Sequence, residues 1–212
     1  MHRLSLCGSL VVTALALTGS ACSSESTPPT TPSNPTAVTE TFTGTVTVNG
    51  AVSFPYIATQ AGSTNATIKT LDPTAMVTVK SGGTGGFIAG ETVYQGATLD
   101  TATWTATVAS WLPNSSVLTV NSLSGGFTAD GAITGVDSKA SWAGSTISTT
   151  VVGIALGTWS GTVCSVVLAN DTAGVGGLIA GVVQGAGSLC ARVYDVGKLP
   201  NTTTFTIEVT HF

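Results

Sequence analysis

Side chains that could carry out acid–base catalysis are few in this chain and lie far apart. His211 is the one histidine beyond His2, and it stands beside the C-terminus on the face of a terminal strand that Val209 shares. A serine triad needs a histidine with a partner carboxylate, and no serine lies in a Gly-x-Ser-x-Gly turn. Glu91 and Asp100 do not define a glycosidase pair, because nothing fixes their separation. We therefore expect no catalytic residue and no enzymatic activity.

Carboxylates offer a second kind of chemistry, the binding of calcium. Asp171 lies in Asn170-Asp171-Thr172 and Asp195 follows Tyr194, so their oxygens could meet at one end of a β-fold around a calcium ion. The chain has no dense Asp-x-Asp run, and Asn and Asp commonly stabilise turns by bonding their own backbone. We favour turn roles for Asp171 and Asp195, and we predict neither a metal ion nor a cofactor.

Aromatic side chains are the candidates for ligand contact. Trp104 and Trp111 are an odd number of positions apart in one predicted strand. They should therefore point to opposite faces, and at least one should be exposed. Tyr94 lies in the preceding strand. An exposed Trp or Tyr can stack on a sugar ring or anchor a protein interface, although large aromatics in small barrels more often pack in the core.

The cysteines are expected to have two different roles, a lipid anchor and a disulfide. Residues 1–21 read as a signal peptide, because a positively charged start is followed by an apolar stretch too short to span a bilayer permanently. The residues before Cys22 resemble the lipobox of bacterial lipoproteins, which implies that Cys22 is lipidated. Gly19 departs from the usual large aliphatic residue, so plain secretion with cleavage after Ala21 stays open. Ser23 favours the outer membrane or the cell surface if the host is Gram-negative.

Cys164 and Cys190 remain after Cys7 leaves with the leader and Cys22 takes the lipid. In an oxidising compartment they are expected to form a disulfide between neighbouring strands, which would stabilise the fold by about 3 kcal/mol. A metal pair is the alternative, but the sequence supplies no clustered histidine or third cysteine.

Composition and charge describe the mature protein. Residues 22–40 are rich in Ser, Thr and Pro and predict a disordered tether. The rest is rich in Thr, Val and Gly, with only 8% charged residues in the whole chain, which favours a secreted all-β protein. Loss of Arg3 with the leader moves the formal charge from −4 to about −5, and an acidic protein of this kind does not suit nucleic-acid binding.

Alternation of apolar and polar residues places the strands. The closing strand, residues 204–210, alternates strictly, and residues 188–197 should pair with it as a hairpin. Residues 41–79 read as a meander of antiparallel strands with a turn at Asn49-Gly50. Residues 104–111 and 117–123 flank a Pro113-Asn114-Ser115 turn. The glycine-rich residues 174–181 lack the Lys-Ser/Thr of a nucleotide-binding loop and are interpreted as a flexible connection.

Two family resemblances organise these strands. Residues 41–79 together with 153–212 resemble the small β-sandwich of the bacterial pre-peptidase C-terminal (PPC) type. The segments that carry the resemblance are Phe42-Thr43-Gly44-Thr45-Val46, Ala66-Thr67-Ile68-Lys69-Thr70-Leu71, Leu156-Gly157-Thr158-Trp159 with Cys164, and residues 188–197 before a Phe-Thr-Ile-Glu-Val strand. Members of that class are usually non-catalytic appendages of secreted proteins. Residues 80–152, with Val93-Tyr94-Gln95-Gly96 before a hairpin, resemble small β-barrel repeats of phage virion proteins.

The sequence thus predicts an all-β chain, an antiparallel jelly-roll or PPC-like β-sandwich with an inserted small β-barrel. The expected organisation is a signal peptide (1–21), a tether (22–40), the first part of the sandwich (41–79), the barrel (80–152) and the rest of the sandwich (153–212). The expected function is a non-enzymatic, envelope-anchored binding or structural module that meets a glycan, an envelope protein or another copy of itself. An accessory protein acting with a secreted hydrolase is the alternative, and a free-standing enzyme comes third.

Overall fold

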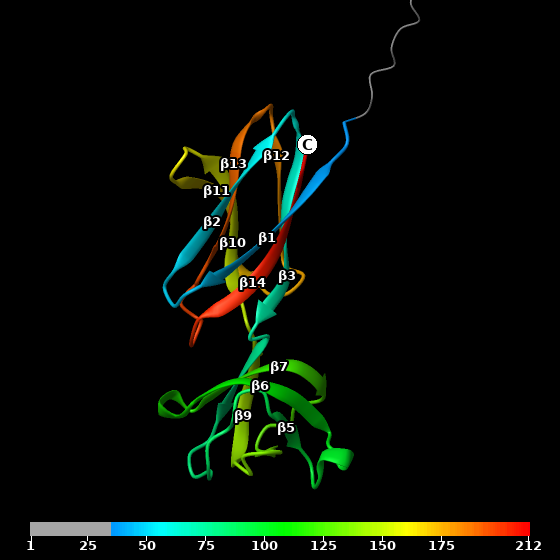
Figure 1. The fold of residues 1–212 in the computed structure, drawn as a ribbon, viewed down its shortest axis with the longest axis vertical. Helices are drawn as coiled ribbons and strands as arrows, with labels where there is room; N and C mark the ends of the chain where they lie inside the picture. Colours follow the sequence, from blue (N-terminus) through cyan, green and yellow to red (C-terminus); the bar gives the residue numbers. More distant parts are fainter. Residues whose placement is uncertain (1–34) are drawn as a thin grey trace, which may run out of the picture. The chain divides into compact units, whose positions relative to one another are not determined.

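Antiparallel strands make up most of residues 35–212, the part of the chain that the computed structural model describes (Figure 1). Eight of these strands form two four-stranded sheets, and six form a closed barrel. The prediction of an all-β fold with a small barrel inserted in an antiparallel sandwich is confirmed. The expected signal peptide, the lipidation of Cys22 and residues 22–34 of the tether lie outside the described residues.

The sandwich is built from strands that are distant in sequence. Its first sheet has the order β1 (Val38–Val46), β14 (Thr203–His211), β3 (Gly62–Asp72) and β12 (Leu178–Val183). Its second sheet has the order β11 (Cys164–Ala173), β10 (Val152–Trp159), β13 (Gly187–Tyr194) and β2 (Ala51–Ala58). Alternating side chains of both sheets meet in one apolar cluster, in which Ile68, Ile154 and Ile207 are fully buried. β1, β12, β2 and β11 are the edge strands.

Two predictions of strand pairing are wrong. The first strands do not form a meander, because β1 pairs with β14 and β2 pairs with β13. β13 and β14 are not a hairpin either, since they lie in different sheets. The turn at Asn49 is present, with the Gly50 N–H donating to Thr47 O at 2.8 Å and Asn49 at a φ of 58°, but it carries the chain from one sheet to the other. Alternation indicated the strands correctly without indicating their partners.

The barrel has the strand order β4-β7-β6-β5-β8-β9 and closes where β9 pairs with β4. Its strands are β4 (Ala75–Val79), β5 (Thr92–Gln95), β6 (Trp104–Leu112), β7 (Val117–Gly125), β8 (Ala132–Gly135) and β9 (Ser141–Thr149), with short 3-10 turns η1 (Leu99–Thr101) and η2 (Pro113–Ser115). The predicted hairpin around Pro113 is observed as β6, η2 and β7. Trp104, Leu118 and Ile133 are fully buried in the barrel core.

The structure shifts the expected boundaries of the sandwich and of the barrel. Val77 was expected in the sandwich, but it pairs with Leu118 of β7 and Ile147 of β9, so the barrel begins at β4 and not at residue 80. β10 already starts at Val152. At the N-terminal side, residues 38–40 were expected in the tether, yet they are paired in β1, where Val38 lies opposite His211. A short alternating segment is compatible with a strand of the sandwich or of the barrel. Only the strands that it pairs with show to which of the two it belongs.

Cys164 and Cys190 form the expected disulfide, with their Cα atoms 5.8 Å apart. They do not lie in neighbouring strands as predicted, because β10 runs between β11 and β13. Cys164 is opposite Trp159 and Cys190 is opposite Gly157. The crosslink therefore ties the edge strand β11 to β13 across β10, and both cysteines are buried.

Candidate binding cleft in the β-sandwich

The aromatic residues expected to contact a ligand are not gathered on one face. Trp104 is 1% exposed and packs edge-on against Phe127 inside the barrel, with ring centroids 5.5 Å apart. Tyr94 is half-buried on the outer side of β5, where Val93 and Gln95 alternate with it toward the interior. These two side chains therefore point to opposite sides of the barrel wall.

Trp111 is half-buried as well, so the prediction that at least one of the two tryptophans is exposed is wrong. Burial alternates regularly from Trp104 to Val108, and a register shift between Val108 and Ser110 then adds one residue on β6 and breaks the alternation. Trp111 consequently packs against the same core as Trp104. Its ring lies 5.3 Å from that of Phe87 and 5.1 Å from that of Trp142, between centroids.

Glu91 is a buried carboxylate with a structural role. Its oxygens accept hydrogen bonds from the backbone N–H groups of Ile88 (2.7 Å), Asp137 (3.0 Å) and Ser138 (2.9 Å), and from Ser138 Oγ (2.7 Å). Burial alone would raise the pKa of Glu91, but these hydrogen bonds outweigh burial and hold the pKa below its ordinary value. Asp100 is exposed in η1 and does not contact Glu91. Glu91 and Asp100 thus differ in burial, and the hydrogen bonds of Glu91 link loops of the barrel.

Asp171 and Asp195 have separate partners. Asp195 accepts backbone N–H groups of Asn49, Gly197, Lys198 and Leu199 at 2.8–3.2 Å. Burial opposes ionisation, but these four hydrogen bonds lower the pKa of Asp195. Asp171 accepts a hydrogen bond from the Tyr194 hydroxyl, and burial followed by this contact raises the pKa of Tyr194 to about 12. No group of three metal-ligating side chains occurs in residues 35–212.

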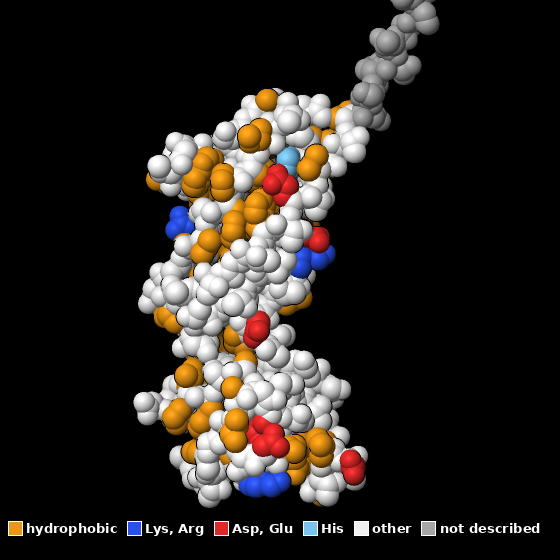
Figure 2. Space-filling model, in the orientation of Figure 1, with side chains coloured by type: hydrophobic (Ala, Val, Ile, Leu, Met, Phe, Trp, Pro, Cys, Tyr) orange, Lys and Arg blue, Asp and Glu red, His pale blue; other side chains and the backbone are white. Residues whose placement is uncertain are grey.

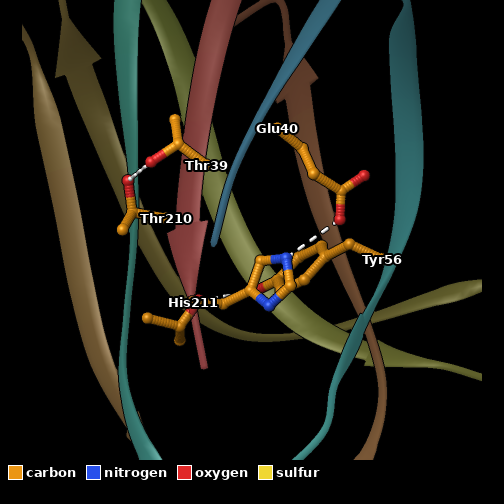
Figure 3. A network of polar contacts seen from close by, with 6 residues as sticks. Thr39, Glu40, Tyr56, Thr210 and His211 are labelled. Atoms are coloured by element: carbon orange, nitrogen blue, oxygen red, sulfur yellow. Dashed lines mark hydrogen bonds and ion pairs between the residues drawn. The ribbon is translucent and has the colours of Figure 1, made fainter. Parts of the chain in front are cut away.

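His211 belongs to a polar network inside the sandwich (Figure 3). It is 4% exposed, on the inward face of β14 as expected, and its Nε2 lies 2.9 Å from Glu40 Oε1. Its ring centroid lies 5.0 Å from that of Tyr56, whose hydroxyl shares a 2.9 Å hydrogen bond with Thr64 Oγ1. Burial, more than the nearby charge of Glu40, raises the pKa of Tyr56. His211 Nδ1 has no hydrogen-bond partner among the described residues.

Beside this network a cleft of about 230 Å³ opens between the edge strands β11 and β12. Its walls are mainly apolar, and the Tyr56 and Thr64 hydroxyls give it a polar end; Leu156, Leu168, Gly181 and Val182 also line it. A Cβ atom at Gly181 would lie 2.8 Å from Leu168 Cδ1, so the glycine leaves room for the Leu168 side chain in the wall of the cleft. The cleft is below the roughly 300–1,000 Å³ of small-molecule pockets, and its size suits one large side chain of a protein partner.

The surface around the cleft is apolar. We call β11, β12 and the turn between them the open side of the sandwich. Six of its large apolar side chains are exposed: Val166, Val167, Leu168, Val175, Leu178 and Val182. Val167 is 70% and Val182 is 74% exposed. In Figure 2 charged side chains are sparse, and apolar ones reach the surface where β11 is labelled in Figure 1. Contiguous apolar surface of this kind marks an interaction site.

The opposite side of the sandwich, between β1 and β2, is closed. The rings of Phe42 and Phe54 stack across it with centroids 5.0 Å apart, and Phe205 packs edge-on against Phe54. Pro55 lies in the edge strand β2, where it removes a backbone donor that another strand could use. The open side has neither device.

Sequence reasoning missed this site because it assigned residues 174–181 to a flexible connection. Residues 174–177 do form the turn, but Leu178 begins β12. The available signal was charge, since no Asp, Glu, Lys or Arg occurs between Asp171 and Arg192. A long uncharged stretch that contains an apolar strand indicates a buried strand or a contact surface, and β12 is at an edge.

Comparison with known proteins gives no relative: no family model, no curated protein and no solved structure matches this chain. Among residues 35–212 no helix is long and apolar enough to cross a membrane. Function must therefore be argued from the arrangement itself.

Proposed function

We propose that this protein is a non-enzymatic module of the bacterial cell envelope that binds a protein partner through the open side of its sandwich. Residues 1–21 direct export, and Cys22 carries the lipid that holds the module at the outer membrane or cell surface. The observation that carries the proposal is the coincidence of an apolar cleft, exposed valines and two free strand edges on one side of the sandwich. Each of these features favours contact with another polypeptide.

Protein contact is favoured over glycan contact by the placement of the aromatics. Glycan recognition relies on exposed aromatic faces, whereas Trp104 is buried and Trp111 is packed against Phe87 and Trp142. A non-enzymatic role is supported by how the carboxylates are used. Glu91 and Asp195 bind their own backbone, and His211 pairs with Glu40 inside the sandwich.

Photo-crosslinking in the intact envelope tests the proposal. A photoreactive residue at Val167 or Val182 should give a covalent adduct with a protein, because both side chains are exposed beside the cleft. The same residue at Val38, which is 50% exposed on β1, serves as the control. Absence of adducts at both Val167 and Val182, with full-length protein present in the envelope, would overturn the proposed binding surface.

The anchor has its own test. Mass spectrometry of the mature protein extracted from membranes should show a diacylated or triacylated Cys22. An unmodified chain that starts at residue 22 would rule out the anchor and make the protein a released, soluble binding partner.

A further inference from the structure

We infer that the partner on the open side is a second copy of this chain, and that two β12 strands pair antiparallel across a two-fold axis. The inference rests on the proposed function, because it names the protein that the open side binds. Such a pairing would join the β1-β14-β3-β12 sheets of two copies into one continuous sheet.

β12 has the properties of a strand that accepts another strand. It pairs with β3 in unbroken register from Leu178 to Val183, and its other edge is the end of the sheet, where the Asn170 side chain of β11 donates a 3.3 Å hydrogen bond to the Leu178 carbonyl. Its sequence, Leu-Ile-Ala-Gly-Val-Val, contains no charge and no proline, which are the devices that usually prevent edge-to-edge pairing. The neighbouring edge strand β11 is a poorer candidate, because two register shifts interrupt its pairing with β10 and it carries Asp171.

Charge argues for a second copy as the occupant. The whole chain has a net charge of −4, so two copies repel each other weakly over most orientations. The stretch between Asp171 and Arg192 is uncharged, and a two-fold axis places this stretch against itself. Contact through β12 is thus an orientation in which the paired strands carry no charge and in which apolar surface is covered on both copies. Lipid anchors would further raise the local concentration of copies.

The pleat of the sheet limits the register. Leu178 lies opposite the outward-facing Thr67, so Leu178, Ala180 and Val182 share the outer face of the sheet. In an antiparallel pair, residues that lie opposite each other point to the same face of the sheet. Each even-numbered residue of one β12 must therefore lie opposite an even-numbered residue of the other β12. An axis through Ala180 pairs Leu178 of one copy with Val182 of the other. This register brings together two side chains that are 53% and 74% exposed in the single chain.

Sedimentation analysis of the mature chain with Cys22→Ser, which removes the lipid, tests the inference. The protein should form a dimer that dissociates on dilution. Val182→Lys should raise the dimer dissociation constant by about a hundredfold, because each copy would place an ammonium group in an apolar contact. Val38→Lys makes the same change at the other edge of the sheet and should leave the dimer intact. Circular dichroism checks that each variant is folded.

Cysteine crosslinking tests the register. With Ala180→Cys, the two new cysteines should face each other with Cα atoms about 4.5–5.5 Å apart, within the range of a disulfide. We expect a disulfide-linked dimer that disappears when Val182→Lys is added. Thr43→Cys, an exposed position on β1, is the control and should not crosslink. A dimer in which Ala180→Cys crosslinks no faster than Thr43→Cys would overturn the inference.

The outcomes separate the inference from the proposed function. A chain that stays monomeric at all concentrations, but forms photo-adducts with a different protein at Val182, refutes the second copy and leaves the open side as a binding surface. A monomer without adducts at Val167 and Val182 refutes both.

Discussion

Replacement of Glu91 by Gln tests how the barrel is held together. The Glu91 carboxylate is 3% exposed and joins three separate backbone N–H groups and one hydroxyl from two loops of the barrel. Gln keeps the shape and one acceptor oxygen but replaces the other with an NH₂ group. In either orientation of the amide, donors would then face donors, because Ile88 and Ser138 donate on one side and Asp137 and Ser138 on the other.

The cost follows from this geometry. A buried N–H group without a partner costs about 1–3 kcal/mol. The Gln amide is least costly with its NH₂ toward the Ser138 hydroxyl, which can turn to accept, so Glu91→Gln leaves the Ile88 N–H without an acceptor and weakens the remaining hydrogen bonds by removing the charge of their acceptor. We expect the free energy of unfolding to fall by about 3 kcal/mol. For a protein of this size that corresponds to a decrease in Tm of about 6–12 °C. Gly135 closes the same pocket, since a Cβ atom there would lie 2.7 Å from Glu91 Oε2, so the surroundings have little room to relax.

The loss of stability in Glu91→Gln should become smaller as the pH falls. The pKa of Glu91 in the folded protein is below its ordinary value of 4.5, so ionisation of Glu91 stabilises the fold. That contribution is complete above about pH 4.5 and is lost as the pH falls through the folded-state pKa. The stability difference between the wild type and Glu91→Gln should therefore be largest near neutral pH and should shrink in acid.

Urea unfolding followed by circular dichroism at several pH values measures this difference. Asp137→Asn is the matched control, because it removes the same charge from an exposed neighbour whose side chain makes none of these hydrogen bonds. It should change the free energy of unfolding by less than about 0.5 kcal/mol. If Glu91→Gln is as stable as Asp137→Asn, or if its deficit does not change with pH, the role assigned to the carboxylate is refuted.

Three further predictions concern single contacts. Reduction of the Cys164–Cys190 disulfide, which closes a separation of 26 residues, should lower the free energy of unfolding by about 3 kcal/mol, measured by thermal melts with and without reductant; the Cys164→Ala/Cys190→Ala double variant should not respond to reductant. Asp195→Asn should cost about 1–2 kcal/mol in urea unfolding at neutral pH, with a smaller loss in acid because the pKa of Asp195 is also lowered; a loss that is constant with pH would contradict this. Trp142→Phe removes the 2.9 Å hydrogen bond from Trp142 Nε1 to Gly85 O and should cost about 1 kcal/mol by the same assay, whereas an unchanged midpoint would show that the bond contributes nothing.

Local sequence determined much of the secondary structure. The hairpin of β6 and β7 followed from two apolar runs around Pro113, and the alternation of residues 204–210 located β14. β9 was not predicted, because Ser141–Thr149 is mostly small and polar and lacks a clear period. Such a strand is defined by its neighbours, since β9 closes the barrel between β8 and β4.

Pairing and side-chain direction could not be obtained in the same way. β1 pairs with β14 at the far end of the chain, as the Thr39–Thr210 hydrogen bond shows, and no local pattern encodes such a partner. The direction of Trp111 depended on a register shift in β6 between Val108 and Ser110, and a prediction from alternation assumes that no such shift occurs. The disulfide was predicted correctly because only two cysteines remained, whereas its position across β10 required the sheet order.

The architecture favours the sandwich over the barrel as the place of the proposed interaction surface. A closed barrel has no strand edge to offer, because every strand has two neighbours. A sandwich has edge strands on two sides, and here Phe42, Phe54 and Pro55 protect the side formed by β1 and β2. On the other side the chain has Gly181 where a side chain would fill the cleft, and valines where charges would repel another strand. If this edge stayed exposed to water, a larger side chain at position 181 would add stability and charged residues in place of the valines would add solubility. This combination supports the proposal that a protein partner covers the open side.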